Sequence, residues 1–262
     1  MTNSMFTDNL EEYDDPISYD LENNAYVGEL PFLMQWASEK KGPIIDLACG
    51  TGRLTIPLAS KGYEMIGVDL HTGMLKQAQR KARELDLQIE WVEQDCTQLN
   101  LDVKSPLVYM VGNSIQHFRT NESQNQLLSS IHNHLLENGV FIFGTRFPSS
   151  EELLQPNTEE YWKTYIDTNS NEEVDVSTIS NYDALGQIQH YTTIRRIKNA
   201  NGEVINEKRT NISLRYTYPK EMERLLAESR FDVVHVYKDW KGTPIDNESY
   251  EMIYVCRKKG NR

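Results

Sequence analysis

The stretch Ile44–Leu54 reads IIDLACGTGRL and decides the fold of this chain. Its apolar start predicts a buried strand, and the small residues that follow predict a turn leading into an amphipathic helix near Gly52. Glycines in such a turn let the backbone approach a ligand that a Cβ would keep away, and the helix start offers unpaired N–H groups. This order is typical of a nucleotide-type pocket at the carboxyl ends of the strands of an open α/β sheet.

Two familiar phosphate-binding loops do not fit this turn. A nicotinamide-binding loop needs a third glycine for close packing of helix and strand, and Thr55 stands at that position. A P-loop needs Gly-Lys-Ser/Thr, which does not follow here. Asp46 lies just before the turn, where a carboxylate would repel a phosphate. It suits a ligand with positive charge, such as the sulfonium and α-amino groups of S-adenosylmethionine.

The run Asp46–Gly52 resembles the first motif of the class I S-adenosylmethionine-dependent methyltransferases. The resemblance extends over residues 40–147 and 219–258. It implies an α/β fold with a Rossmann-like, doubly wound sheet of seven strands, of which the last is antiparallel. It also implies S-adenosylmethionine as cofactor and S-adenosylhomocysteine as its product. The residues of this motif that we expect at the cofactor are Asp46, Ala48, Gly50 and Gly52.

Acidic residues lie at the ends of the next two predicted strands. Residues 64–70 form an apolar run with Asp69 near its end, about as far behind the glycines as the acid that meets a ribose in dinucleotide folds. In the family the matching acid binds the ribose hydroxyls. Leu70 and Met74 lie in the same matching run, so the resemblance implies that they also lie at the cofactor. The helical spacing of Met74 also fits a position in the core. By the same resemblance, Asp95 would bind the adenine amino group and the Cys96 N–H a ring nitrogen.

The strand predicted at residues 106–111 ends where the resemblance implies the methyl group and its acceptor. We therefore expect Val111 at the cofactor. The segment with His117 resembles the same region of bacterial amino-sugar N-methyltransferases, where a matching His is a candidate base. An imidazole can take up a proton near neutral pH, but a lone His is often structural. His132 and His134 lie two apart on a predicted helix and do not face each other, so no metal site is expected.

Composition narrows the class of substrate. The net charge of −12 argues against a nucleic-acid substrate, because such proteins usually carry a basic patch; a local patch stays possible, and a small-molecule acceptor is favoured. The three cysteines are far apart and form no C-x-x-C pair, which indicates reduced thiols. We expect neither a leader nor a membrane span, because the N-terminal residues are polar and acidic and no run approaches about 20 apolar residues. We expect a soluble, cytoplasmic protein that is a monomer or a homodimer.

The first 24 residues are acidic and irregular. They form either a solvated tail or, as the resemblance implies, a lid over the cofactor, with Tyr19 and Asp20 as the first lid candidate and Tyr13 as the second. The predicted division of the chain is therefore a cofactor-binding core, residues 1–147 and 219–262, with an N-terminal lid at 1–24, and an insertion at residues 148–218.

The insertion is predicted to be an antiparallel sheet that covers the acceptor side. Three segments alternate polar and apolar residues, as half-exposed strands do, and Asn201-Gly202 indicates a hairpin turn. These strands are expected at 173–183, 187–198 and 204–216. The aromatic residues of the insertion form either its own small core or the wall of an acceptor pocket; they include Trp162, Tyr165, Tyr182, Tyr191 and Tyr216.

The remaining core elements follow the same alternation of helix and strand. Arg230 stands where the family usually has glycine, so the last helix-to-strand turn is expected to differ. Helices are predicted at 27–40, 74–85, 124–136 and 220–228, with a short one at 151–154, and further strands at 89–92, 140–145, 232–237 and 250–257.

The function expected from this sequence is methyl transfer from S-adenosylmethionine to N or O of a small molecule, with His117 as the candidate base. Three alternatives stay open. The protein could bind S-adenosylmethionine or its product without catalysis, it could methylate RNA or protein, or it could transfer hydride on the same topology, against which the missing third glycine argues.

Overall fold

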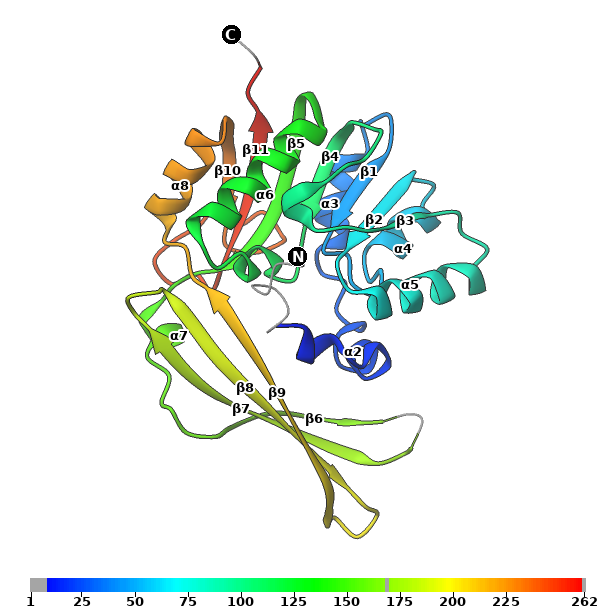
Figure 1. Ribbon diagram of the computed structural model, residues 1–262, viewed down its shortest axis with the longest axis vertical. Helices are drawn as coiled ribbons and strands as arrows, with labels where there is room; N and C mark the ends of the chain where they lie inside the picture. The colour runs from blue at the N-terminus through cyan, green and yellow to red at the C-terminus, as the bar shows by residue number, and fades with distance from the viewer. Residues whose placement is uncertain (1–8, 168–169, 261–262) are drawn as a thin grey trace. The chain divides into compact units, whose positions relative to one another are not determined.

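The computed structural model describes residues 9–167 and 170–260 (Figure 1). The chain divides into two compact units. The core unit comprises Val27–Ser149 and Thr217–Arg262, and the insertion unit comprises Met1–Tyr26 and Ser150–Tyr216. Within the described ranges, no helix is both long and apolar enough to span a membrane.

The core unit contains the seven-stranded sheet that the sequence predicts. Its strand order is β10-β11-β5-β4-β1-β2-β3. The strands from β1 to β5 pair in parallel, whereas β11 is antiparallel to both β5 and β10. The predicted fold class, with the last strand antiparallel, is therefore confirmed. The strands are β1 (Ile44–Leu47), β2 (Met65–Asp69), β3 (Glu90–Glu93), β4 (Ser105–Met110), β5 (Leu135–Arg146), β10 (Phe231–Tyr237) and β11 (Glu251–Lys258).

Apolar runs form the middle of this sheet because helices cover it. Every residue of β1, β2 and β4 is buried, as expected for parallel strands with both faces covered. Helix α3 contacts α4, which contacts α5, and α6 contacts the short helix η2; Figure 1 shows α6 in front of β5 and α3 behind β1. The helices are α3 (Leu30–Ala37), α4 (Thr55–Ser60), α5 (Thr72–Glu84), η2 (Cys96–Gln98), η3 (Ser114–His117), α6 (Asn121–His134) and α8 (Pro219–Glu228).

One boundary in the core differs clearly from the prediction. Helix α6 ends at His134 and β5 begins at Leu135, five residues before the predicted start of that strand. Leu135 pairs with Ser105, and after a register shift Val140 pairs with Leu107. Asn138 lies within the strand and adopts a φ of +60°. Leu135 is fully buried, as expected for a strand residue in the core.

In the turn after α8, Arg230 adopts the backbone conformation that a glycine would usually provide. Arg230 follows the helix end with a φ of +65°, the left-handed conformation that glycine favours after a helix. For a residue with a Cβ, this conformation costs about 1–2 kcal/mol.

The insertion unit contains a four-stranded antiparallel sheet in the order β6-β7-β8-β9. Three of its strands and the hairpin between Lys198 and Val204 match the prediction, whereas β6 was missed. Strand β6 is an edge strand whose residues are mostly exposed, so it lacks the alternation that identifies its neighbours. The elements are α7 (Ser150–Leu153), β6 (Glu160–Ile166), β7 (Glu173–Asp183), β8 (Ile188–Lys198) and β9 (Val204–Arg215).

The N-terminal segment packs with the insertion rather than with the core. It contains η1 (Leu10–Tyr13) and α2 (Pro16–Asn23). Asn9 exchanges two hydrogen bonds of 2.8 Å with the backbone of Ser213 on β9. This grouping differs from the sequence-based division, which joined residues 1–24 to the core; of these, residues 1–8 lie outside the described part.

Candidate active site

The carboxyl ends of four parallel strands meet at one edge of the core sheet. Ile45 pairs with Ile66 on one side and with Val108 on the other, so β1, β2 and β4 end at nearby levels; Asp69 at the end of β2 pairs with Glu93. This edge therefore gathers the residues that follow the strands, which is where open α/β sheets bind ligands. The segments brought together are 46–52, 69–74, 95–96 and 111–117.

The loop after β1 is shaped by three left-handed residues. Ala48, Gly50 and Gly52 have φ values of +52°, +57° and +78°. The Cys49 N–H donates to Val68 O at 3.0 Å, and Ile56 N–H donates to Gly52 O at 3.0 Å. Regular helix α4 begins only at Thr55, three residues beyond the predicted start. The intervening residues turn the chain back from the end of β1.

Asp69 fastens this loop to the end of β2. Its Oδ2 accepts the Gly50 N–H at 2.7 Å, and its Oδ1 accepts the His71 N–H at 2.8 Å. Burial raises the pKa of Asp69, and these backbone hydrogen bonds oppose the shift. A carboxylate oxygen has two lone pairs, so each oxygen can accept one further hydrogen bond.

Asp46 lies deeper, below the loop. It is 1% exposed, and its Oδ2 accepts the Thr55 hydroxyl at 2.6 Å. Its Oδ1 is buried without a hydrogen-bond partner among the described residues. Burial raises the pKa of Asp46 to about 7, although Thr55, Tyr109 and the charge of Arg53 oppose the rise. Arg53 itself forms an ion pair with Glu29 at 2.7 Å.

Gly52 is required for packing as well as for its φ. A Cβ at Gly52 would lie 2.7 Å from the Trp91 ring, and a Cβ at Gly67 would lie 2.5 Å from the same ring. Both distances are far below van der Waals contact, so these two glycines make room for Trp91 of β3. Sequence reasoning explained Gly52 by the approach of a ligand and missed Trp91. Met74 is 2% exposed and its Cε would lie 3.3 Å from a Cβ at Gly50, so it supports the loop from within the core.

Asp95 and Cys96 form the neighbouring corner of this edge. Asp95 Oδ1 accepts both the N–H and the hydroxyl of Thr97 at 2.8 Å, which caps η2. Cys96 is buried, and burial raises the pKa of its thiol to about 12. This thiol is inert at neutral pH, so the part of Cys96 available for recognition is its backbone. Leu70 at the end of β2 is 40% exposed and offers an aliphatic surface at the same edge.

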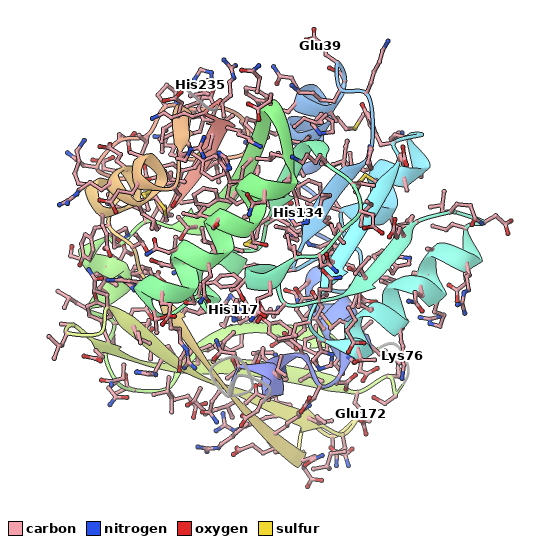
Figure 2. The ribbon with its side chains drawn as sticks, turned by 45° about the horizontal axis from the view of Figure 1, so that its top comes forward. Glu39, Lys76, His117, His134, Glu172 and His235 are labelled. Atoms are coloured by element: carbon pink, nitrogen blue, oxygen red, sulfur yellow. The ribbon has the colours of Figure 1, made fainter. Side chains whose placement is uncertain are left out.

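The end of β4 makes a sharp turn. Val111 is buried, and Gly112 and Asn113 both have positive φ, at +65° and +59°. The Ser114 hydroxyl donates to Val111 O at 2.7 Å and closes the turn. His117 ends η3, is half-buried, and is labelled in Figure 2. Burial, with a further contribution from the Arg119 charge, lowers the pKa of His117 to about 4, so its imidazole is neutral at physiological pH.

The other two histidines singled out by the sequence lie on α6. His134, also labelled in Figure 2, contacts Ser130 O through Nδ1 at 2.8 Å and accepts the Leu101 N–H through Nε2 at 3.2 Å. These contacts give it a structural role. In the described part of the chain, no group of three or more His, Cys, Asp or Glu is placed to hold a metal ion.

Several aromatic residues of the insertion build its own core around Glu152, which sequence reasoning missed. The hydroxyls of Tyr191 and Tyr216 donate to Glu152 Oε1 at 2.8 and 2.5 Å, and the Tyr182 ring packs edge-on against Tyr216. Trp162, in contrast, is 56% exposed on β6. The insertion therefore holds aromatic residues that pack into its own core and an exposed one, Trp162.

The lid candidates lie on the N-terminal helices of the insertion unit. The rings of Tyr13 and Tyr19 are 5.7 Å apart. Tyr19 lines a small cavity of about 100 Å³ with Tyr165, Arg195 and other residues of the unit. The Arg195 guanidinium pairs with Glu12 at 2.5 Å and with Glu22 at 2.6 Å, which fixes this segment to β8.

The comparisons with known proteins agree with this geometry. Residues 44–139 match the family described as a methyltransferase domain. A putative methyltransferase from Geobacillus sp. (strain WCH70) is 24% identical over 228 residues, which cover 86% of this chain and 88% of that protein. A carboxy-S-adenosyl-L-methionine synthase from Campylobacter hominis is 28% identical over 159 residues, 58% of this chain and 65% of that protein.

Solved structures share the fold over nearly the whole chain. An S-adenosylmethionine-dependent methyltransferase from Clostridium acetobutylicum superposes with a TM-score of 0.77 at 22% identity, covering 93% of this chain and 97% of that one. A sugar N-methyltransferase from Streptoalloteichus sp. gives a TM-score of 0.69 at 16% identity, covering 91% and 89%. Residues 44–139 thus form a methyltransferase domain, and the protein is an S-adenosylmethionine-dependent methyltransferase.

The residues at the sheet edge fit S-adenosylmethionine. Asp46 Oδ1 is a buried acceptor with no partner in the described chain, which suits a nearby cationic group. Asp69 keeps lone pairs for two hydroxyls, and Leu70 offers an exposed aliphatic surface. A ligand with an ammonium group, a ribose and a flat base would satisfy all three.

Proposed function

We propose that this methyltransferase acts on a nitrogen or oxygen nucleophile of a small molecule. The observation that carries the proposal is the position of His117 at the end of η3, just after the end of β4 and at the sheet edge that also holds Asp69. The lowered pKa of His117 is consistent with a neutral imidazole there. Two further facts support it. The net charge of −12 disfavours a polyanionic substrate, and the likeness to a sugar N-methyltransferase extends over the insertion as well as the core.

The residues of the sheet edge hold the cofactor in this proposal. Asp69 accepts hydrogen bonds from the ribose hydroxyls through its two remaining lone pairs. Asp95 has a carboxylate oxygen beyond the one that binds Thr97 and takes the adenine amino group, beside the backbone of Cys96. The side chain of Asp46 is almost fully buried. In this proposal it therefore stabilises the positive end of the ligand through its negative charge.

His117 acts on the acceptor. When bound, S-adenosylmethionine supplies a methyl group already activated by its sulfonium. The protein then contributes alignment, which is worth about 7–11 kcal/mol in favourable cases. A neutral imidazole accepts a hydrogen bond from an amine or hydroxyl and receives its proton as that group becomes bonded. Because a pKa of about 4 makes His117 a weak base, we expect its contribution at the low end of the about 10²–10⁴-fold range of general-base help.

Labelled methyl transfer tests this function. The protein is incubated with methyl-labelled S-adenosylmethionine and cell extract, which is then separated into small-molecule, protein and RNA fractions. We expect label in the small-molecule fraction, and a strong loss of that label with His117→Ala. Label confined to RNA or protein would contradict the acceptor class while keeping the reaction.

The remaining alternatives have their own readouts in the same experiment. Binding of S-adenosylmethionine with no labelled product in any fraction would indicate a catalytically silent binding protein. Because one relative is named a carboxy-S-adenosyl-L-methionine synthase, the mass of the recovered S-adenosylmethionine is also measured. A carboxylated form of it, without a methylated acceptor, would replace the proposal by that chemistry.

A further inference from the structure

The edge of the core sheet opposite the candidate active site gathers basic side chains. Arg257 near the end of β11 pairs with Val140, which is paired with Leu107 of β4, and Leu107 is paired with Ile44, the first residue of β1. Arg257 therefore lies level with the start of β1, whereas the cofactor loop follows the end of that strand. Any ligand bound near Arg257 occupies a site separate from the reaction.

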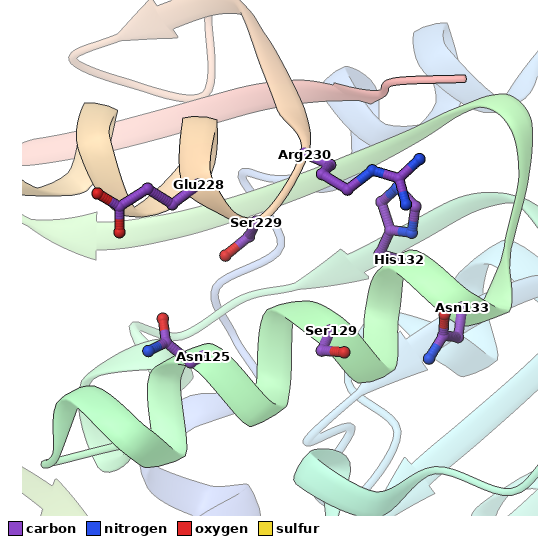
Figure 3. A pocket seen from close by; sticks show the side chains of 7 residues that line it. All are labelled: Asn125, Ser129, His132, Asn133, Glu228, Ser229 and Arg230. Atoms are coloured by element: carbon purple, nitrogen blue, oxygen red, sulfur yellow. The ribbon is translucent and has the colours of Figure 1, made fainter. Parts of the chain in front are cut away.

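Two polar cavities adjoin at this edge and share Arg230. One, of about 370 Å³, lies between α6 and the end of α8 and is shown in Figure 3. The other, of about 930 Å³, lies beside the end of β11. We call the two together the basic cavity. Its lining includes Arg230, Arg257, Lys258, Lys259, His132 and Ser129.

The acidic groups around the basic cavity are already partnered. Asp232 pairs with Lys259 at 3.0 Å, and Glu137 with Lys258 at 3.4 Å. Glu228, which also lines the cavity, pairs with Arg224 at 4.0 Å. Arg257 is exposed and has no ion pair within the described chain. The lining of the basic cavity thus holds four basic and two acidic side chains. In a protein of net charge −12, this is a local excess of positive charge that a bound anion would offset.

Two features of individual residues in the basic cavity indicate a site for an anionic ligand. Arg230 occupies a left-handed position, φ +65°, that glycine would fill without strain. His132 is 8% exposed, and its Nε2 is buried with no hydrogen-bond partner in the described residues. Figure 3 shows the His132 ring and the Arg230 guanidinium converging from α6 and from the turn after α8. Burial and the charges of Lys258 and Arg230 lower the pKa of His132, so the ring senses the potential of this cavity.

We propose that the basic cavity binds the phosphate group of a phosphorylated small molecule. Guanidinium groups match phosphate oxygens in a two-point geometry, and Arg230 and Arg257 provide two of them. The cavity is larger than one phosphate, and its neutral polar residues, among them Ser129, Asn133 and Ser229, suit the hydroxyls of a sugar or polyol. The site goes beyond the proposed methyl transfer and does not depend on it.

Calorimetric titration of the whole protein with glucose 6-phosphate tests the site, with glucose as the control that lacks the phosphate. We expect binding of the phosphate ester alone, weakened about tenfold in Arg230→Gly and in Arg257→Gln. Arg80→Gln, which removes an exposed cation on α5, is expected to bind as the native protein does. Arg230→Gly relieves the strained φ, so loss of binding in that variant does not reflect unfolding.

The titration of His132 followed by NMR gives a second readout. Bound phosphate offsets the charge of Arg230, so we expect the pKa of His132 to rise on addition of glucose 6-phosphate but not of glucose. Native affinity in Arg230→Gly, equal binding of glucose, or an unchanged His132 titration would each overturn the proposal. Binding of a short single-stranded RNA in place of the sugar phosphate would overturn it in favour of a nucleic-acid surface.

Discussion

The hydroxyl of Thr55 donates a hydrogen bond of 2.6 Å to the buried carboxylate of Asp46. Thr55 stands where a nicotinamide-binding loop would have its third glycine, so it argues against a nicotinamide cofactor. The same residue supports Asp46, the acid that suits S-adenosylmethionine. Asp46 is 1% exposed, and this is the hydrogen bond that compensates its Oδ2 for lost water. The loop after β1 is therefore anchored from below by Asp46 and from the side by Asp69.

The raised pKa of Asp46 predicts a pH-dependent stability of the ligand-free protein. Its native pKa is about 7, against about 3.9 in an unfolded chain. The folded state then binds the proton more tightly, so this contribution to stability is present at low pH and is lost as the pH rises toward about 7. We predict that Asp46→Asn flattens the fall in the free energy of unfolding between about pH 5 and about pH 7.5, measured with urea.

Asp69 also has a raised pKa. Because Asp69 is present in both the native protein and Asp46→Asn, its contribution to the pH dependence cancels when the two are compared. Thr55→Val is expected to move the fall to higher pH, because it removes a hydrogen bond that favours the charged form of Asp46. Equal slopes in the native protein and in Asp46→Asn would contradict this account.

The contact between Gly67 and Trp91 predicts a coupling between the two residues. A methyl group at Gly67 would lie 2.5 Å from the ring, and overpacking of this kind costs about 1–3 kcal/mol. Gly67→Ala is therefore expected to lower the free energy of unfolding by that amount. In Gly67→Ala/Trp91→Leu the smaller side chain leaves room for the methyl group, so the two changes should cost less together than their sum. Strict additivity in urea unfolding would show that Trp91 is not what requires glycine.

Arg195 and Arg196 offer a matched pair for testing how the N-terminal segment is held. Arg195 pairs with Glu12 and Glu22 of that segment, whereas Arg196 pairs with Glu159 and Glu207, which lie beside or on strands of the insertion. We predict that Arg195→Met increases amide hydrogen exchange in residues 9–26 and that Arg196→Met does not. Equal exchange in both variants would mean that these ion pairs do not fix the segment.

His117 is predicted to act in turnover rather than in cofactor binding. With its pKa lowered to about 4, it stays neutral through the physiological range, so the rate should show no fall from its titration above about pH 5. His117→Ala is expected to lower kcat by about 10²-fold, the low end of general-base help because the imidazole is a weak base, and to leave the dissociation constant of S-adenosylmethionine unchanged. Weakened cofactor binding with an unchanged kcat would indicate a structural role.

The sequence predicted the parts of this site that follow directly from local order along the chain. A strand, a glycine turn and a second strand that ends in an acid suffice to bring Gly50 and Asp69 together, because parallel strands end at one edge. The helical spacing of Met74 likewise indicated its buried position.

Relationships across long separations could not be predicted. The contacts of Arg195 with Glu12 and Glu22 bridge more than 170 residues, and no local pattern marks them. Trp91 was treated only as part of a strand, and its demand for two glycines depends on how β3 packs. Strand β6 escaped detection because an exposed edge imposes no alternation.

The affinity for S-adenosylmethionine in two variants tests the central claim most directly. Asp69→Asn puts an NH₂ group where the carboxylate accepts the Gly50 or His71 N–H, whereas Glu93→Gln changes the exposed partner of Asp69 in the adjacent strand. Calorimetry on both folded variants is expected to show affinity lowered by at least about tenfold in Asp69→Asn and native affinity in Glu93→Gln. Native affinity in Asp69→Asn would contradict the placement of the cofactor at this edge of the sheet.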